Sequence, residues 1–263
     1  MHLVAFHGYP LDHRIWSPLA ARAAAGALGP ITSVFAPDFR GRGTSLRPAA
    51  TMHTMSLLAD DMAEEISRAL PEGEPFVLAG LSMGGYVAFE FLKRHGARER
   101  DRLKGLALFD TKASADDDAD RAKRKEAIEA LRKGGIEAAL SAMLPKLLAR
   151  SSKNTPVEET ARAMILATPP GTAMADLAGL ALRDEGFDVL SGWEKPLLVV
   201  VGDEDAIAPP SDAEEMTAVA GRASWVSLVT VPRAGHLVPL ENPGEAADAL
   251  VALAARAISP TPR

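Results

Sequence analysis

The sequence predicts an α/β fold in which a mostly parallel β-sheet is covered by helices on both faces and carries an all-helical insertion. Three observations support this fold class. Short apolar runs alternate with helical patterns along the chain. Residues 197–201 are apolar throughout, as in a strand that is covered on both faces. Residues 112–192 contain no strand pattern at all, and the length of 263 residues suits one large domain or two small ones.

The expected strands are the short apolar runs, and helices are expected between them. The strands comprise residues 3–6, 31–36, 76–79, 103–109, 197–201 and 225–231. Between the second and third of these, Leu58, Met62, Ile66 and Leu70 recur every four residues, which is typical of the buried stripe of a helix. The Asn-Pro pair at residues 242–243 predicts the start of the last helix.

Residues 112–192 are expected to form a helical cap, with residues 1–111 and 193–263 forming the core. The stripe that contains Ile136, Leu140 and Leu144 predicts a cap helix, which Pro145 should kink or split. A capping box with a first-turn proline at residues 155–158 predicts a second helix. Acidic residues at 116–120 followed by basic residues at 121–125 are expected to be the two ends of a solvated helix face.

The composition excludes several classes of protein. The net charge of −6 leaves no basic surplus for a nucleic-acid partner. The absence of cysteine rules out disulfides, thiol nucleophiles and cysteine-based zinc sites. No apolar run approaches the roughly 20 residues of a membrane span, and the first residues lack the pattern of a signal peptide. We therefore expect a cytoplasmic protein without a membrane partner.

A glycine-rich junction between a strand and a helix contains the candidate nucleophile. The run Gly80-Leu81-Ser82-Met83-Gly84 follows an apolar strand and opens a helical segment. In such a nucleophile elbow the tight turn strains the backbone of the serine and needs small neighbours. The turn also presents the hydroxyl at a helix N-terminus, where a developing negative charge is favoured. Ser82 is therefore the expected nucleophile.

A serine nucleophile needs a base, and the base needs an acid that orients it. Of six histidines, only His236 lies in a glycine-flanked loop after a late strand, and it is the expected base. Three acids follow strand ends and satisfy the positional requirement, namely Asp110, Asp203 and Asp205. His7 is expected to anchor its own loop by hydrogen bonding.

Together with four further motifs, this arrangement resembles the α/β-hydrolase superfamily over nearly the whole chain. The motifs lie at residues 7–10 (His-Gly-Tyr-Pro), 37–45 (Pro-Asp-Phe-Arg-Gly-Arg-Gly-Thr-Ser), 202–205 (Gly-Asp-Glu-Asp) and 234–236 (Ala-Gly-His). The resemblance implies the chain order serine, acid, histidine, so that Asp205 is the implied acid. It also implies a lid inserted after the sixth strand. Only six residues precede His7, which departs from the strand hairpin that usually leads the family's fold.

The resemblance further implies an oxyanion hole made by the backbone N–H groups of Tyr9 and Met83. Methionine and leucine side chains cluster in the expected cap helices, and flexible methionines suit irregular apolar space. We therefore expect Met143, Leu147 and Met164 to line an apolar acyl pocket.

Within the superfamily the chain is most similar to small lidded esterases and lactonases, including enol-lactonase-like hydrolases. This similarity implies cleavage of a small-molecule carboxylic ester or lactone through an acyl-enzyme, with no metal or cofactor. Alternatives are cofactor-free perhydrolysis or haloperoxidase-like activity, carbon–carbon bond hydrolysis, and a ligand-binding receptor on the same fold. The glycine-rich loop at residues 40–43 is expected to shape the floor near the site, and for Arg40 and Arg42 a structural role is favoured over contact with the substrate.

Overall fold

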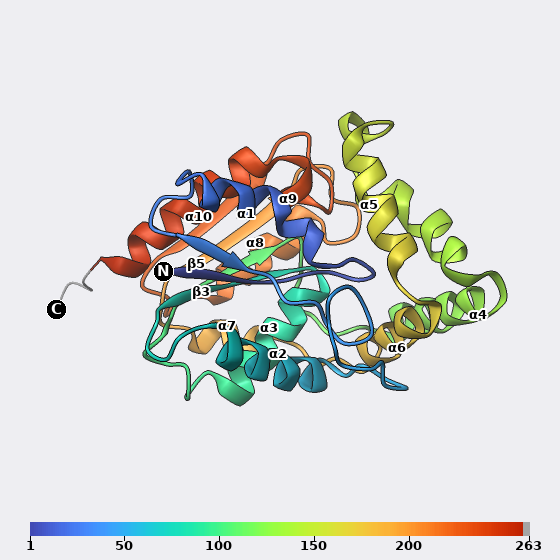
Figure 1. Cartoon of the computed structure of the whole chain (residues 1–263), viewed down its shortest axis with the longest axis horizontal. Coiled ribbons are helices and arrows are strands. Elements are labelled where there is room, and N and C mark those ends of the chain that lie inside the picture. Colours follow the sequence, from blue (N-terminus) through green and yellow to red (C-terminus); the bar gives the residue numbers. More distant parts are fainter. Residues whose placement is uncertain (260–263) are drawn as a thin grey trace.

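A computed structural model describes residues 1–259, in which six strands form one sheet (Figure 1). All neighbouring strands are parallel, in the order β2-β1-β3-β4-β5-β6. The strands are β1 (His2–Phe6), β2 (Ser33–Phe35), β3 (Phe76–Leu81), β4 (Leu103–Phe109), β5 (Leu197–Gly202) and β6 (Val226–Val231). Each coincides with an expected strand except for small shifts of its ends, so the predicted α/β class is confirmed.

Helices cover both faces of the sheet. The helices α1 (Ser17–Ala24) and α10 (Pro243–Ile258) pack together on one face, and α2 (Met55–Ala69) and α3 (Met83–His95) on the other (Figure 1). The helix α8 (Pro210–Val219) follows β5, and the short elements η1 (His13–Trp16) and α9 (Val238–Glu241) lie in loops. Every residue of β3 and β5 is buried, as expected of strands covered on both sides. The stripe predicted for α2 is buried as well.

Residues 112–192 contain only helices among their regular elements. These are α4 (Asp118–Leu147), η2 (Arg150–Ser152), α5 (Pro156–Ala167), α6 (Pro170–Leu180) and α7 (Phe187–Gly192). Figure 1 shows α4, α5 and α6 beyond the carboxyl ends of the strands, whereas α7 packs against α3 and α8. We call residues 112–192 the helical insertion. It follows β4, the fourth strand, whereas we expected it after the sixth strand. The difference arises because the expected number counts the two strands of the family's leading hairpin, which the six-stranded sheet of residues 1–259 lacks.

The longest helix of the insertion bends at a glycine. Gly135 has φ 66° and ψ −162°, and it divides α4 into two helical halves. Of the two expected effects of Pro145, a kink or a split, the split does not occur, because Pro145 lies within the second helical half of α4. A glycine pair has low helix propensity, and glycine adopts a positive φ without steric cost, so the bend forms there. In the described range, no helix combines the length and apolarity that a membrane span requires.

Candidate active site

Ser82 lies in a strained turn between β3 and α3. Its backbone has φ 52° and ψ −116°, in a region that non-glycine residues seldom adopt. A side chain at Gly80 would overlap the backbone of Gly84, and one at Gly84 would overlap the carbonyl group of Phe6. The two glycines of the motif therefore allow the turn to close, as predicted. The N–H group of Ser82 still donates to the carbonyl oxygen of Phe109, at 3.0 Å, so the turn is tied to β4.

The structure brings together three of the side chains selected from the sequence. Nε2 of His236 lies 2.8 Å from Oγ of Ser82, and Nδ1 of His236 lies 2.8 Å from Oδ2 of Asp205. The second carboxylate oxygen of Asp205 accepts the backbone N–H groups of Ile207 (2.8 Å) and Ala208 (3.0 Å). His236 and Asp205 are both buried, so solvent competes little for these hydrogen bonds.

The two other acids considered from the sequence do not bind His236. Asp203 is exposed to solvent. Asp110 is buried, and its carboxylate accepts the N–H groups of Gly202 (3.1 Å) and Val238 (2.9 Å). Burial and the negative charge of Asp205 raise the pKa of Asp110. Asp110 thus joins the backbone of the loop that contains Asp205 to the backbone that follows His236.

The loop at residues 7–10 lies against the nucleophile. A side chain on Gly8 would come within 3.2 Å of Cβ of Ser82, so this loop passes close to the serine. Within residues 1–259, the backbone N–H groups of Tyr9 and Met83 have no hydrogen-bond acceptor. Both of the donors expected for an oxyanion hole are therefore free to bind another acceptor.

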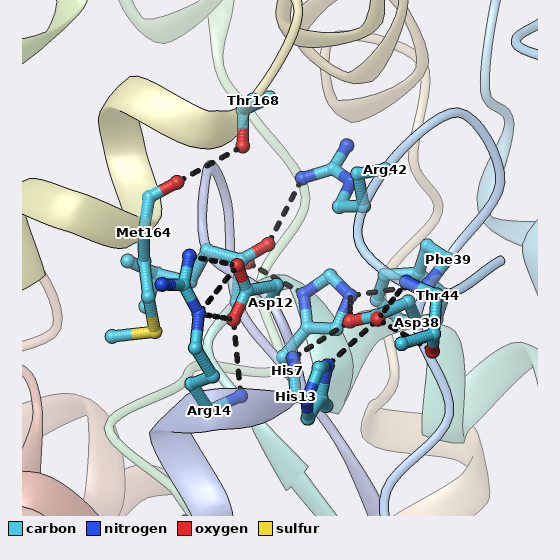
Figure 2. A network of polar contacts seen from close by, with 12 residues as sticks. His7, Asp12, His13, Arg14, Asp38, Phe39, Arg42, Thr44, Met164 and Thr168 are labelled. Carbon is cyan, nitrogen blue, oxygen red and sulfur yellow. Dashed lines mark hydrogen bonds and ion pairs between the residues drawn. The ribbon is translucent and has the colours of Figure 1, made fainter.

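Figure 2 shows the polar network that holds this loop. His7 donates from Nδ1 to the carbonyl oxygen of Gly8 (2.9 Å), and its Nε2 accepts the N–H group of Phe39 (3.1 Å). Asp38 accepts the backbone N–H groups of His13 (2.7 Å) and Thr44 (2.6 Å). Burial and the positive charge of Arg42 lower the pKa of His7 to about 4. His7 anchors its own loop, as expected from the sequence.

One group of potential metal ligands occurs among the described residues. Oxygen and nitrogen atoms of Asp12, His13 and Asp38 lie within 4.8 Å of one another. Arg14 binds both carboxylate oxygens of Asp12, at 2.9 and 2.6 Å (Figure 2). His13 also contacts Asp38 through Nδ1, at 2.7 Å. The hydrogen-bonding groups of these residues are therefore already paired with one another. This arrangement suits a structural support for the loop better than a metal site.

The helical insertion contacts the loops on both sides of the serine. Thr168, at the end of α5, donates from its hydroxyl to the carbonyl oxygen of Pro10 (2.9 Å). At the end of α4, the carbonyl oxygen of Leu147 accepts the N–H group of His236 (2.8 Å). Glu241 accepts the N–H groups of Gly235 and Ala149, each at 2.8 Å, and so bridges the histidine loop and the insertion.

Sequence reasoning did not find Thr168 or Glu241. Thr168 and its partner are 158 residues apart in the chain, and Glu241 and Ala149 are 92 residues apart. No local pattern marks either side chain, because its role depends on which distant backbone group it meets. The sequence offers one signal for Glu241: it is an acid in the otherwise apolar segment that follows His236.

A cavity of about 320 Å³ lies between the insertion and the core. On the core side Tyr9, Tyr86 and Ile207 line it, and Tyr86 lies one helical turn after Ser82. The insertion contributes Met143 and several alanines, namely Ala127, Ala130, Ala138, Ala139 and Ala142. Leu147 and Met164, which were expected to line a pocket with Met143, do not face this cavity. They are fully buried in the packing of α4 and α5.

The expectation of a solvated charged face on the insertion was only half right. Asp117, Asp118 and Lys125 are exposed, as expected. Asp116 is buried and accepts Nε of Arg124 at 2.8 Å, while Arg124 lines the cavity. A run of charged residues in the sequence does not show which of the side chains become buried when the helix packs against the core.

The two arginines of the 37–45 motif have structural partners. Arg40 binds both carboxylate oxygens of Asp61, at 2.6 and 2.8 Å. Arg42 is buried, pairs with Asp176 of α6, and donates to the carbonyl oxygen of Leu11 at 3.3 Å. Neither side chain lines the cavity, so both serve the packing near the site.

The parallel sheet, the strained serine turn and the adjoining histidine and acid loops define the class of α/β hydrolases. The chain belongs to the alpha/beta hydrolase family, whose sequence profile matches residues 3–249. It is similar to a thermophilic esterase from Thermogutta terrifontis, with 34% identity and a TM-score of 0.87, over 98% of this chain and 91% of that one.

Two further relatives agree with this assignment. A hydrolase from Pseudomonas aeruginosa PA01 has 25% identity and a TM-score of 0.80, over 96% of this chain and 89% of that one. The AB hydrolase superfamily protein YisY of Bacillus subtilis is 28% identical over 226 residues, which cover 81% of this chain and 78% of that protein. The family and these relatives support a hydrolase that acts on a small molecule.

Proposed function

We propose that the protein is a serine hydrolase that cleaves a carboxylic ester or lactone through an acyl-enzyme. The observation that carries the proposal is the chain of two 2.8 Å contacts from Ser82 through His236 to Asp205. A serine held in a strained turn and hydrogen-bonded to a histidine, which an acid orients in turn, is the arrangement that activates a hydroxyl for nucleophilic attack.

In the proposed first step, Nε2 of His236 accepts the proton of the Ser82 hydroxyl while Oγ attacks the carbonyl carbon of the substrate. The carbonyl oxygen becomes negative and accepts hydrogen bonds from the N–H groups of Tyr9 and Met83. His236 then returns the proton to the leaving alcohol. In a lactone this alcohol remains attached to the acyl chain.

In the second step, water gives a proton to His236 and attacks the acyl carbon, which releases the acid and restores Ser82. Asp205 keeps the proton of the histidine on Nδ1, so that Nε2 is free to accept. The amide donors of Ile207 and Ala208 fix the carboxylate in the orientation that this role requires.

We further propose that residues 112–192 act as a lid on a core formed by residues 1–111 and 193–263. The cavity between the two is of the size of a small-ligand site. Its alanine-rich wall leaves room for the acyl part of a substrate, with Met143 as a flexible apolar contact.

A fluorophosphonate probe tests this proposal, because it modifies only activated serines. We expect mass spectrometry to find the label on Ser82, and Ser82→Ala to lower the turnover of a nitrophenyl ester by at least about a thousandfold. Ser211→Ala, at an exposed serine, is the matched control and should retain activity. Labelling elsewhere with Ser82 unmodified would contradict the mechanism, and binding without turnover would indicate a receptor instead.

A further inference from the structure

Several positive side chains line the cavity, and two of them share one acid. We define the cationic end as Lys112, Lys123 and Arg124, all of which line the cavity. Lys112 follows the carboxyl end of β4, and the other two lie in the first turns of α4. One acid, Asp120, lines the same end.

Asp120 is shared between the two lysines of the cationic end. Its carboxylate oxygens lie 3.5 Å from Nζ of Lys112 and 3.0 Å from Nζ of Lys123. One negative charge therefore serves two positive charges. The neighbouring Asp118 is fully exposed and pairs with Arg121, at 3.1 Å, on the solvent side.

Asp116 is shared in the same way between two arginines. It accepts Nε of Arg124 at 2.8 Å and also pairs with Arg183, which lies over the ring of Tyr86 at 4.2 Å. Burial would raise the pKa of Asp116, but hydrogen bonds and charges from the two arginines outweigh it and lower the pKa. Four cations thus share two carboxylates in direct contacts, so positive charge is in excess within this cluster of ion pairs.

Arg124 is held in place with part of its guanidinium group unused. Asp116 accepts from Nε (2.8 Å) and from Nη2 (3.4 Å), whereas Nη1 has no hydrogen bond with any residue of the range 1–259. The side chain of Arg124 is 25% exposed. A guanidinium group oriented by a buried acid, with a free N–H edge, suits recognition of a carboxylate.

Part of the cavity wall is apolar. The alanines of α4, Leu131 and Met143 all line the cavity. Tyr9, which we place next to the reacting carbonyl group, lies on the core side. A molecule bound in the cavity next to Tyr9 can therefore contact both apolar side chains and the positive charges of the cationic end. Lys146, which also lines the cavity, adds positive charge near the end of α4.

We propose that the cationic end binds a carboxylate carried by the acyl part of the substrate, so that monoesters of short dicarboxylic acids are preferred. This inference rests on the proposed hydrolysis at Ser82. The carboxylate offsets part of the excess positive charge of the cluster, and partial exclusion of water strengthens its attraction to Arg124.

Two substrates that differ in one charge test the inference. They are the mono-nitrophenyl ester of glutaric acid and its methyl-capped counterpart, which has the same acyl length without the carboxylate. We expect kcat/KM to favour the charged ester by about tenfold or more. Arg124→Gln should remove most of this preference, and added salt should reduce it. Arg121→Gln, one helical turn away and directed to solvent, is the matched control and should retain it.

Lys123→Gln is a second variant in case the loss of Arg124 disturbs the fold, since the side chain of Lys123 is 73% exposed. It should lower the preference in the same direction. If the wild-type protein cleaves the neutral ester as well as the charged one, the inference is overturned while the proposed hydrolysis stands. If neither ester is cleaved, the proposed function fails. Calorimetry with glutarate then tests the cationic end alone: weaker binding by Arg124→Gln than by the wild type supports it, and equal or absent binding overturns it.

Discussion

Asp110 and Asp205 follow the carboxyl ends of the neighbouring strands β4 and β5, yet their carboxylates have different partners. Asp205 contacts Nδ1 of His236 at 2.8 Å. Asp110 accepts two backbone N–H groups and holds the loops around the histidine in register. At the scale of residues, one acid contacts the imidazole of His236, and the other binds the backbone of the loops around it.

This difference predicts opposite consequences for the two amide variants. Asp205→Asn should lower kcat by about ten-thousandfold with little loss of stability, because the amide no longer favours the productive histidine tautomer. Asp110→Asn should lower the free energy of unfolding by about 1–3 kcal/mol, because its NH₂ group faces a backbone donor. Ester turnover and urea unfolding measure the two effects. A reversed pattern would show that the acids have been assigned the wrong way round.

His7 should remain neutral well below the ordinary range of histidine. Burial and the charge of Arg42 lower its pKa from 6.5 to about 4. Because the folded-state pKa lies below the unfolded one, the unfolded chain binds the proton first. Stability from this group is therefore complete above pH 6.5 and falls by about 1.4 kcal/mol per unit as the pH drops towards 4.

Nitrogen-15 NMR checks this prediction directly. At pH 5.5 the spectrum should show His7 with the proton on Nδ1 and none on Nε2, because Nε2 accepts from Phe39. His95, which is partly exposed, provides an internal comparison. Protonation of His7 near pH 6.5 would contradict the predicted effect of its burial.

At the scale of elements, the helical insertion is bonded to both loops that flank Ser82. The end of α5 supports the carbonyl group of Pro10 through Thr168, next to the N–H group of Tyr9. The end of α4 accepts the N–H group of His236. The insertion therefore helps to position the loops in addition to covering the sheet edge.

Replacement of the Thr168 hydroxyl should disturb the loop at residues 7–10, whose Tyr9 N–H group we propose as an oxyanion donor. Thr168→Val keeps the shape and removes the donor, and we expect kcat to fall by about tenfold with little change in KM. Thr168→Ser should restore the rate, because it keeps the hydroxyl.

Thr172→Val is the matched control for this experiment. Thr172 is also buried and also donates to a core carbonyl oxygen at 2.9 Å, but its acceptor is Gly41 and not the loop at residues 7–10. It should lose stability to a similar extent while retaining most of its kcat. If kcat falls equally in both valine variants, Thr168 contributes only to packing and does not position the loop at residues 7–10.

At the scale of the whole molecule, a buried ionic network joins the insertion to the core. Asp176 of α6 is fully buried and accepts from Arg42 and from Nδ1 of His53, the latter at 2.7 Å. Close by, a side chain at Gly179 would overlap the carbonyl group of His53, so α6 lies directly on the core backbone. Because of the tight fit and the shared charges, we expect the insertion and the core to unfold together.

Removal of the central acid should therefore weaken the entire fold. Asp176→Ala leaves Arg42 buried without its counter-charge and should lower the free energy of unfolding by about 3–5 kcal/mol in a single urea transition. Asp60→Ala removes a partly exposed acid that also has two partners, Arg94 and His95, and should cost less than about 1 kcal/mol. Two separate transitions would show instead that the insertion unfolds independently of the core.

Much of the architecture could be predicted because its signals are local. Strands covered on both faces are apolar throughout, and the glycines at 80 and 84 are required by the turn that holds Ser82. The expected meeting of Ser82, His236 and Asp205 followed from motifs at strand ends, and parallel strands bring such ends to one edge of the sheet.

The sequence by itself determined the α/β class, the family and the residues expected to meet at the strand ends. Only the tertiary structure decided which side chains face the cavity and which support the loops. Met143 lines the cavity, while Leu147 and Met164 are covered by neighbouring helices. The physical reason is that a periodic row of apolar residues predicts which face of a helix is buried, but it does not predict whether a neighbouring helix or a cavity lies against that face. Partners such as Thr168 and Pro10, 158 residues apart, become neighbours only when the insertion packs on the core.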